Sequence, residues 1–304
     1  MQLNYAERIN ETSKASAMVI GDTCHHDHAA PTHDAATVSP IRMLSAYGPK
    51  QNRLLAALPT EEYERILPSL EFYSAPQGSV INESGDRLDW VYFPISGIVS
   101  LGYPLENGAS PAIAIAGNDG LVGMALFMGG DRSPTQAEVQ IASCGYRLRA
   151  SALRRELQQG GRLLPLSMMY AQAMISQVTQ TAVCNRLHSV EQQLCRWLLM
   201  IMDAMPSGEV RMTQQGISNM IGVRRESVTM AAGSLQADNL IQYNRGCIHV
   251  LNRHGLEERA CECYSVVKKE FDRLLPGSGS GSGSAQRSYA IGKQPARLAS
   301  VALN

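Results

Sequence analysis

The most informative segment of this chain is MTQQGISNMIGVRRESVT, at residues 212–229. Its apolar residues can hold two short helices together across a break at Gly222, and we expect these helices at residues 213–220 and 225–236. The apolar side chains in question are Ile217, Met220, Ile221, Val223 and Val228. Two helices joined by a short glycine-containing turn form a helix-turn-helix.

Polar residues gather where the second of these helices begins. They are Arg224, Arg225, Glu226, Ser227 and Thr229. A recognition helix contacts DNA bases with its N-terminal end. Arginine can donate two hydrogen bonds to guanine, glutamate can accept one from cytosine, and hydroxyl groups can hold phosphates. The alternative is a solvated helix start in a domain that binds no nucleic acid.

Two short strands are expected next, at residues 240–243 and 247–251, around a turn that contains Arg245. They predict a β-wing. The whole chain has 27 basic and 27 acidic residues, so any attraction to nucleic acid must be local. Residues 211–254 contain five basic residues (211, 224, 225, 245, 253) and two acidic ones (226, 238), which leaves a net charge of +3 in this segment.

A long helix precedes this unit at residues 163–188, and a small antiparallel roll or barrel is expected at residues 70–150. Short apolar strands separated by glycines, among them Gly97 and Gly145, indicate the roll. The long helix carries a seam with the spacing of a coiled coil, and we interpret this seam as a dimer interface. Its residues are Met168, Ala171, Ile175, Val178, Ala182 and Asn185. The alternative is a seam buried within its own domain.

The chain therefore divides into five predicted parts. They are a flexible arm (1–48), a β-roll domain (49–162), a dimerisation helix (163–188), a winged helix-turn-helix domain (189–276) and a Gly-Ser linker with a basic tail (277–304). The Gly-Ser repeat could be natural or introduced. The longest apolar run has six residues, Trp197 to Met202, so we expect no membrane span and a cytoplasmic protein.

Residues 213–228, followed by Leu240-Ile241 and the Gly246 wing, resemble the winged helix-turn-helix of the Crp/Fnr transcription regulators. The preceding roll and long helix resemble the cyclic-nucleotide-binding-like sensor of that family. The resemblance covers about residues 50–275. It implies an α+β fold with a jelly-roll-like antiparallel β-roll, a dimerisation helix and a C-terminal winged helix-turn-helix. The implied partners are double-stranded DNA, a second copy of the chain and RNA polymerase.

The resemblance also implies roles for individual residues. Arg225 and Glu226 match the base-reading Arg-Glu pair of the family, and Arg224 and Ser227 occupy positions that contact phosphates or base edges. The remaining DNA-binding candidates are Thr213, Gln215, Thr229 and Arg245. Met230 departs from the family, because a second base-reading arginine occupies this place in its best-known branch.

The sensor departs further from members of the family that bind cyclic AMP. Those members have a Gly-Glu pair whose glutamate binds the ribose, whereas this chain has Gly123-Met124, and methionine cannot accept that hydrogen bond. The candidate effector-binding residues are Gly123, Gly129, Gly130, Arg132, Ser133 and Thr179. We expect no certain cofactor, and either an unidentified small-molecule effector other than cyclic AMP or a sensor that has lost its ligand.

Metal and enzyme functions have weaker signals. Cys24, His25, His26, His28 and His33 could ligate a metal but lie in the arm, where Cys24 alone cannot hold the iron-sulfur cluster of the Fnr branch. The sequence places Cys261 and Cys263 on different helix faces and predicts that the cysteines are buried structural thiols. A cupin-like enzyme needs strand histidines, and all seven histidines lie outside residues 70–150. We expect no enzyme. A regulatory module that acts on a protein partner is the alternative function.

Overall fold

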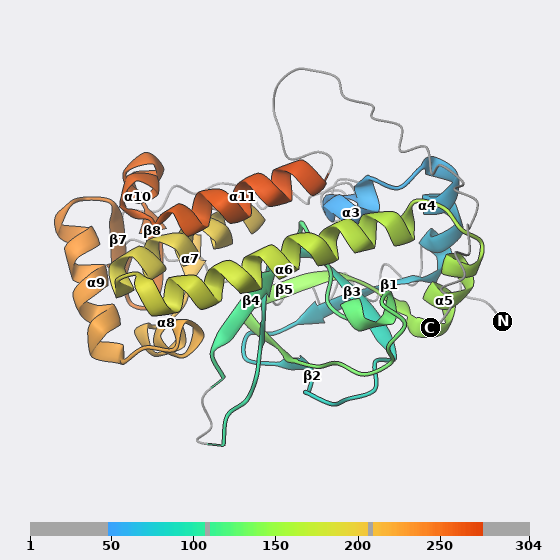
Figure 1. Cartoon of the computed structure of the whole chain (residues 1–304), viewed down its shortest axis with the longest axis horizontal. Coiled ribbons are helices and arrows are strands. Elements are labelled where there is room, and N and C mark those ends of the chain that lie inside the picture. The colour runs from blue at the N-terminus through green and yellow to red at the C-terminus, as the bar shows by residue number, and fades with distance from the viewer. Residues whose placement is uncertain (1–47, 107–109, 206–208, 276–304) are drawn as a thin grey trace, which may run out of the picture.

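A computed structural model describes residues 48–106, 110–205 and 209–275. The predicted N-terminal arm with its cysteine and histidines, and the Gly-Ser linker with its basic tail, lie outside these residues. The described chain has an α+β fold. A β-roll, a long central helix and a C-terminal helical unit with a small sheet follow one another (Figure 1).

Short helices open the described chain and pack beside the roll. They are η1 (Pro49–Gln51), α3 (Arg53–Ala56), α4 (Thr60–Ile66) and η2 (Leu67–Ser69). Asn52 fixes them to the sheet, because its fully buried amide donates to the carbonyl oxygens of Pro94 at 2.9 Å and Gly120 at 2.7 Å. Its Oδ1 atom caps α3 by accepting from the amides of Leu54 and Leu55.

The roll is an antiparallel sheet in the order β1-β5-β3-β4, with β2 paired to β5. Its elements are β1 (Leu70–Ala75), β2 (Val80–Asn82), β3 (Trp90–Gly102), β4 (Ala112–Ala116), the turn η3 (Met124–Leu126) and β5 (Gln136–Arg149). The glycines Gly97 and Gly145 were expected between strands, and that expectation is wrong. They lie inside β3 and β5, where a Cβ atom would approach backbone atoms of the paired strand to 2.3 Å or less. The register of β3 shifts around Gly97, so one long strand bends where two were expected.

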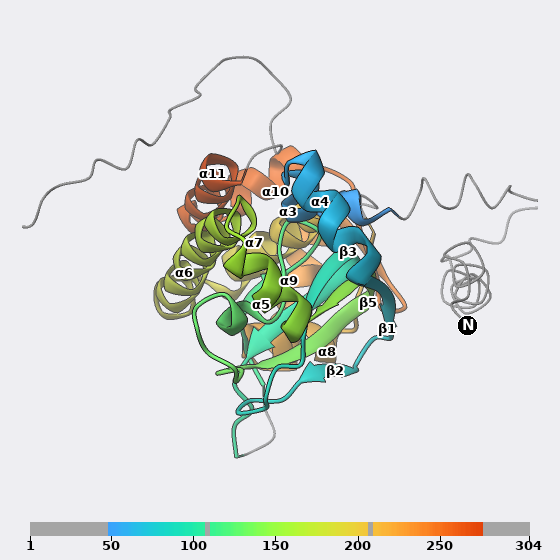
Figure 2. The same ribbon diagram turned by 90° about the vertical axis from the view of Figure 1, so that its right-hand side faces the viewer.

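The helix α5 (Ala150–Gln158) leads to the 25-residue helix α6 (Leu163–Leu187), close to the predicted bounds. One face of α6 is buried within the chain. Gln177 on that face accepts a hydrogen bond from the Ile115 amide of β4 at 2.6 Å, and the Tyr170 hydroxyl donates to the Leu121 carbonyl at 3.2 Å. In Figure 2, α6 lies beside α11 at the edge of the molecule.

The C-terminal unit begins with α7 (Val190–Ala204), whose capping box joins Ser189 and Gln192. Its other elements are β6 (Glu209–Arg211), α8 (Gln214–Ile221), α9 (Arg225–Ala237), β7 (Ile241–Asn244), β8 (Cys247–Val250), α10 (Arg253–Arg259) and α11 (Glu262–Leu274). The chain continues into α10 and α11, and α11 returns along α6, where Phe271 and Tyr170 meet edge to face at 6.3 Å between ring centroids.

The roll and the C-terminal unit are in direct contact. A Cβ atom added to Gly117, just after β4, would lie 2.5 Å from the Cβ atom of Ala204 at the end of α7. A Cβ atom on Gly222, in the turn after α8, would lie 3.2 Å from Pro111, just before β4. A single cluster of buried apolar side chains therefore runs from the first helices through α6 and α7 into α8, α9 and α11.

The N-terminus of α6 depends on one carboxylate. Glu62 of α4 is buried and accepts from the amides of Arg162, at 2.8 and 2.9 Å, and Leu163, at 3.3 Å. Replacing Glu62 by alanine should lower the free energy of unfolding by about 1–3 kcal/mol, because these amides lose their acceptor. Urea denaturation at a fixed protein concentration measures this. The exposed neighbour Glu61 provides the matched control, and equal losses in Glu61→Ala and Glu62→Ala would contradict the prediction.

Candidate functional site

The helix-turn-helix has the geometry that the sequence predicts. Thr213 caps α8, because its Oγ1 atom accepts from the Gly216 amide at 3.0 Å. Gly222 ends α8 in the left-handed conformation with φ of 79°, which glycine adopts at little cost. Val228 of α9 is fully buried against this unit, so the position of the second helix relative to the first is fixed by packing.

The start of α9 presents polar side chains to solvent. Arg224, Arg225, Glu226 and Thr229 are exposed, and Ser227 is half-buried. Among the residues that the structure describes, neither of these two arginines forms an ion pair. Their charges are therefore available to a partner.

Other candidate DNA-binding residues lie near the polar side chains at the start of α9. The Thr229 hydroxyl donates to Gln214 Oε1 at 2.9 Å, which ties the exposed face of α9 to the start of α8. Gln215 is exposed on α8 and donates to Asn219 Oδ1 at 2.8 Å. A groove along α9 borders the same face, and its lining includes Gln214, Thr229, Gly233 and Tyr243.

The wing stands beside the helix-turn-helix. Arg245 is exposed at its tip with φ of 48°, next to Gly246 with φ of 80°. The Met212 amide donates to the Gly246 carbonyl at 2.9 Å, so the wing is attached to the residue that precedes the α8 cap. Arg253 lies outside this surface, because it pairs with Asp203 at 2.6 Å and Glu257 at 2.9 Å. The sequence did not predict β6, the third strand of the wing sheet.

The candidate effector residues fall into two groups. Gly123 is the N-cap of η3, and Gly129, Gly130, Arg132 and Ser133 lie on the loop between η3 and β5; Gly123 and Gly129 have positive φ. Thr179 is exposed on α6, where its hydroxyl donates to the Ile175 carbonyl at 2.8 Å. In the described part of the chain, no hydrogen bond joins Thr179 to the loop.

The polar groups of this loop bind other parts of the same chain. The Arg132 guanidinium donates to the Gly85 carbonyl at 2.8 Å. The Ser133 side chain is buried, and its hydroxyl donates to the Thr135 carbonyl at 2.6 Å. Met124 packs against the main apolar core. The roll also holds a second buried cluster, in which Tyr73 and Tyr92 pack edge to face, and the Tyr92 hydroxyl bonds with Ser143.

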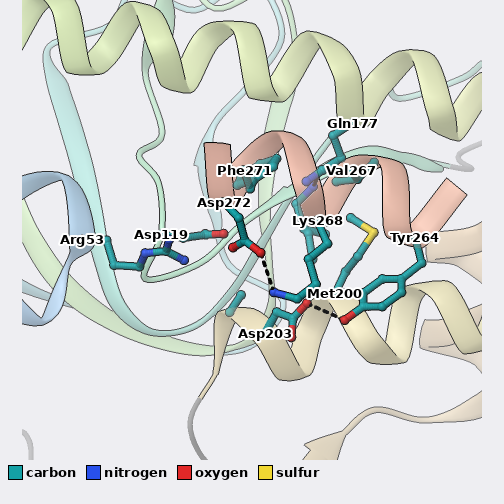
Figure 3. Close-up of a pocket in the computed structure, with 12 residues that line it drawn as sticks. Arg53, Asp119, Gln177, Met200, Asp203, Tyr264, Val267, Lys268, Phe271 and Asp272 are labelled. Atoms are coloured by element: carbon teal, nitrogen blue, oxygen red, sulfur yellow. Dashed lines mark hydrogen bonds and ion pairs between the residues drawn. The ribbon is translucent and has the colours of Figure 1, made fainter. Parts of the chain in front are cut away.

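A cavity of about 180 Å³ lies between the roll, α6, α7 and α11 (Figure 3). Arg53 and Asp119 reach it from the roll side, and Asp203 and Lys268 from the C-terminal unit. Burial raises the pKa of the Asp119 carboxyl. The cavity is smaller than the roughly 300 Å³ at which ligand pockets for drug-sized molecules begin, so we do not assign an effector to it.

Four residues that the sequence analysis did not group lie together at the far end of α6. Cys184, His188, Cys261 and Cys263 place one ligating atom each within 4.8 Å of one another. The expectation that Cys261 and Cys263 occupy different helix faces is wrong, because Cys261 is the extended N-cap of α11 and only Cys263 lies within the helix. The hydrogen bond with Cys184 lowers the pKa of the Cys261 thiol, whereas burial raises the pKa of the Cys263 thiol.

Two family models match the chain. The cyclic nucleotide-binding domain matches residues 73–160, and the Crp-like helix-turn-helix domain matches residues 192–259. Together they cover about half of the chain and fall on the roll and on the helix-turn-helix. These domains define a DNA-binding regulator with a cyclic nucleotide-binding domain. The chain belongs to the Crp/Fnr family of transcription regulators.

Two solved structures share the fold of this chain. The c-di-GMP-responsive global regulator CLP of Xanthomonas campestris is 19% identical, with a TM-score of 0.52 over 63% of this chain and 99% of its own. FixK2 of Bradyrhizobium japonicum is 16% identical, with a TM-score of 0.54 over 63% of this chain and 98% of its own. No curated protein matches the chain at a significant level. Within the described residues, no helix combines the length and the apolarity that a bilayer span requires.

Proposed function

We propose that this protein is a homodimeric, sequence-specific transcription regulator whose sensor responds to an effector other than cyclic AMP or works without one. The observation that carries the proposal is the exposed row of Arg224, Arg225, Glu226 and Thr229 at the start of α9, beside Arg245 of the wing. This end of a recognition helix is the part that reaches base edges in the major groove. Arg225 and Glu226 would read bases, and Arg224, Ser227, Thr213, Gln215 and Arg245 would hold the DNA backbone.

The dimer would form along α6. Its exposed large apolar side chains are Leu164, Ile175, Val178, Val183 and Leu187, and Ile175 is 61% exposed. Of the predicted seam, Ala182 and Asn185 are also exposed and Met168 is half-buried, whereas Ala171 is already buried within the chain. Exposure of such an apolar stripe to water is unfavourable, and a second copy that covers the stripe would remove this cost. The two copies of α9 would then enter successive major grooves about 34 Å apart.

The hydrogen bonds of the sensor loop support the effector part of the proposal. Arg132 and Ser133, which would hold a cyclic phosphate, are bonded to Gly85 and Thr135. A cyclic nucleotide would have to displace these bonds and would still find a methionine at position 124, where the ribose needs an acceptor. As the family resemblance implies, we further propose that the DNA-bound dimer contacts RNA polymerase in the cytoplasm. The domain boundaries remain those that the sequence predicts.

Sequence readout can be tested on two neighbouring arginines. Arg225→Ala should weaken binding to the preferred site by about 1–3 kcal/mol and flatten the preference at one position in each half-site, because a paired contact to guanine is lost. Arg224→Ala should weaken binding to all DNA sequences about equally. It should also lower the slope of the logarithm of affinity against the logarithm of salt concentration by roughly one unit per contact. Selection from random duplexes at two salt concentrations measures both effects. Glu226→Ala is the control, because it should relax base preference without weakening non-specific binding. An unchanged base preference in Arg225→Ala would contradict the placement of the recognition helix.

The dimer can be tested on the exposed stripe. The double variant Ile175→Asp, Val178→Asp would place four charges in the seam of a dimer, and it should be monomeric by light scattering. The matched control replaces Val80 and Leu251, which are also exposed apolar residues but lie away from α6, by aspartate. The control should stay dimeric. An undiminished dimer in the Ile175, Val178 variant would show that the interface lies elsewhere.

Calorimetry tests the effector proposal. The wild-type protein should show no micromolar binding of cyclic AMP, and added cyclic AMP should leave its affinity for DNA unchanged. Arg132→Ala should behave as the wild type does in the same titration. Micromolar binding that disappears in Arg132→Ala would restore the ordinary cyclic nucleotide mechanism and overturn this part of the proposal.

A further inference from the structure

We propose that Cys184, His188, Cys261 and Cys263 form a binding site for one Zn²⁺ ion, which fastens the end of α6 to the start of α11. Cys184 lies on the last turn of α6, and His188 is the C-cap of that helix, whose backbone N–H donates to the Cys184 carbonyl at 3.0 Å. Cys261 and Cys263 come from the turn between α10 and α11 and from the first turn of α11. The three cysteines are buried and His188 is half-buried.

The distances fit a single tetrahedral ion. Zinc binds cysteine sulfur at about 2.3 Å and histidine nitrogen at about 2.0 Å, so the ligand atoms of a tetrahedral site lie about 3.5–3.8 Å apart. The Sγ atoms of Cys184 and Cys261 are 3.5 Å apart, and Cys263 Sγ is 3.6 Å from His188 Nδ1. An iron-sulfur cluster needs its cysteine sulfurs farther apart, because iron and sulfide atoms stand between them. The geometry therefore favours one ion.

The surroundings of His188 match those of a metal ligand. Its Nδ1 atom faces the cysteines, and its Nε2 atom lies 3.4 Å from a carboxylate oxygen of Glu262. Metal-bound histidines generally donate their second ring N–H to such an acceptor, which orients the ring and fixes the tautomer.

A buried arginine can balance the negative charge of the zinc-loaded site. Three thiolates and a neutral histidine around Zn²⁺ carry a net charge of about −1. Arg196 of α7 is fully buried, and in the described chain it pairs with no carboxylate; its Nη2 atom donates to Thr181 Oγ1 at 3.1 Å. Thr181 lies one helical turn before Cys184 on α6, so the guanidinium lies on the same part of that helix as the thiol. An unpaired guanidinium in the interior is costly, and an anionic metal site beside it would offset that cost.

The position of the site gives it a mechanical role. His188 ends α6 and Ser189 begins α7, so the site lies at the bend where the long helix passes into the DNA-binding unit. Without the ion, this bend is held to α11 by thiol packing and weak sulfur hydrogen bonds. With it, four coordinate bonds join two segments that are 77 residues apart in the chain.

Metal analysis of the full chain tests the assignment. The reduced wild-type protein should bind about one Zn²⁺ per chain by mass spectrometry of metals. After chelation, Co²⁺ should give the thiolate charge-transfer and intense d–d bands of a tetrahedral, sulfur-rich site. Removal of the ion should lower the thermal midpoint, and added Zn²⁺ should restore it. Cys184→Ser, Cys261→Ser and Cys263→Ser should each lose the cobalt spectrum.

Cys195→Ser is the matched control, because Cys195 is fully buried on the neighbouring helix α7 but lies outside the four-residue group. It should keep one ion per chain and the full spectrum. If a variant of one of the metal ligands does not fold, cobalt titration of the wild type still tests whether the site binds a metal ion, since it needs no substitution. Reduced, folded wild-type protein that takes up neither ion overturns the proposal. So does a Cys184–Cys261 disulfide in place of zinc in protein isolated under air-free conditions, because the cluster would then be a redox pair.

The orienting carboxylate allows a graded test. Glu262→Ala should keep the tetrahedral cobalt spectrum but weaken Zn²⁺ binding by about 10- to 100-fold, as loss of a histidine partner typically does. Competition with a chromogenic chelator measures this affinity. Glu258→Ala is the control, because that carboxylate faces His254, outside the site. Equal affinities in the wild type and in Glu262→Ala would remove the orienting role from Glu262.

Discussion

The burial of one face of α6 is the constraint on which the rest of this molecule depends. That face binds the roll through Gln177 and the Ile115 amide, and it receives α11 of the DNA-binding unit along its length. The opposite face of α6 is exposed, and it carries the apolar residues that we propose to pack against a second copy. Intrachain packing, the assembly that we propose and the link between the two domains therefore all involve a single element, and its first turn is held by the buried carboxylate of Glu62.

The sequence predicted those parts of the fold that local patterns determine. Gly222 marked the turn of the helix-turn-helix, Ser189 and Gln192 marked the start of α7, and the bounds of α6 were nearly correct. The predictions were wrong where contacts between residues far apart in the chain determine the structure. Gly97 reads as a strand end, yet it lies within β3 because the backbone of β5 leaves no room for a side chain there. Similarly, nothing near Arg132 in the sequence reveals that the Gly85 carbonyl accepts its hydrogen bond.

The cysteines show the same limit in the site. Cys184 and His188 have the four-residue spacing of two ligands on one helix, and this signal was available from the sequence. Cys261 and Cys263 seemed incompatible with a shared site only under the assumption of a continuous helix. The extended conformation of Cys261 brings both thiols to the same point, and the fold then supplies Cys184 from 77 residues away. Burial of a cysteine and its availability as a ligand are thus separate properties, and only the second depends on which neighbours the fold provides.

The roll and the DNA-binding unit approach each other closely at two points. At Gly117 and Ala204, the two surfaces approach so closely that a single added carbon would collide, and the turn at Gly222 touches Pro111 in the same interface. Densely packed surfaces resist sliding and instead separate and repack in a new register. A movement of α8 and α9 relative to the roll would therefore occur as a jump between two docked positions. A signal that acts on such a molecule would change the fraction of chains in each position and would not set a graded tilt of the recognition helix.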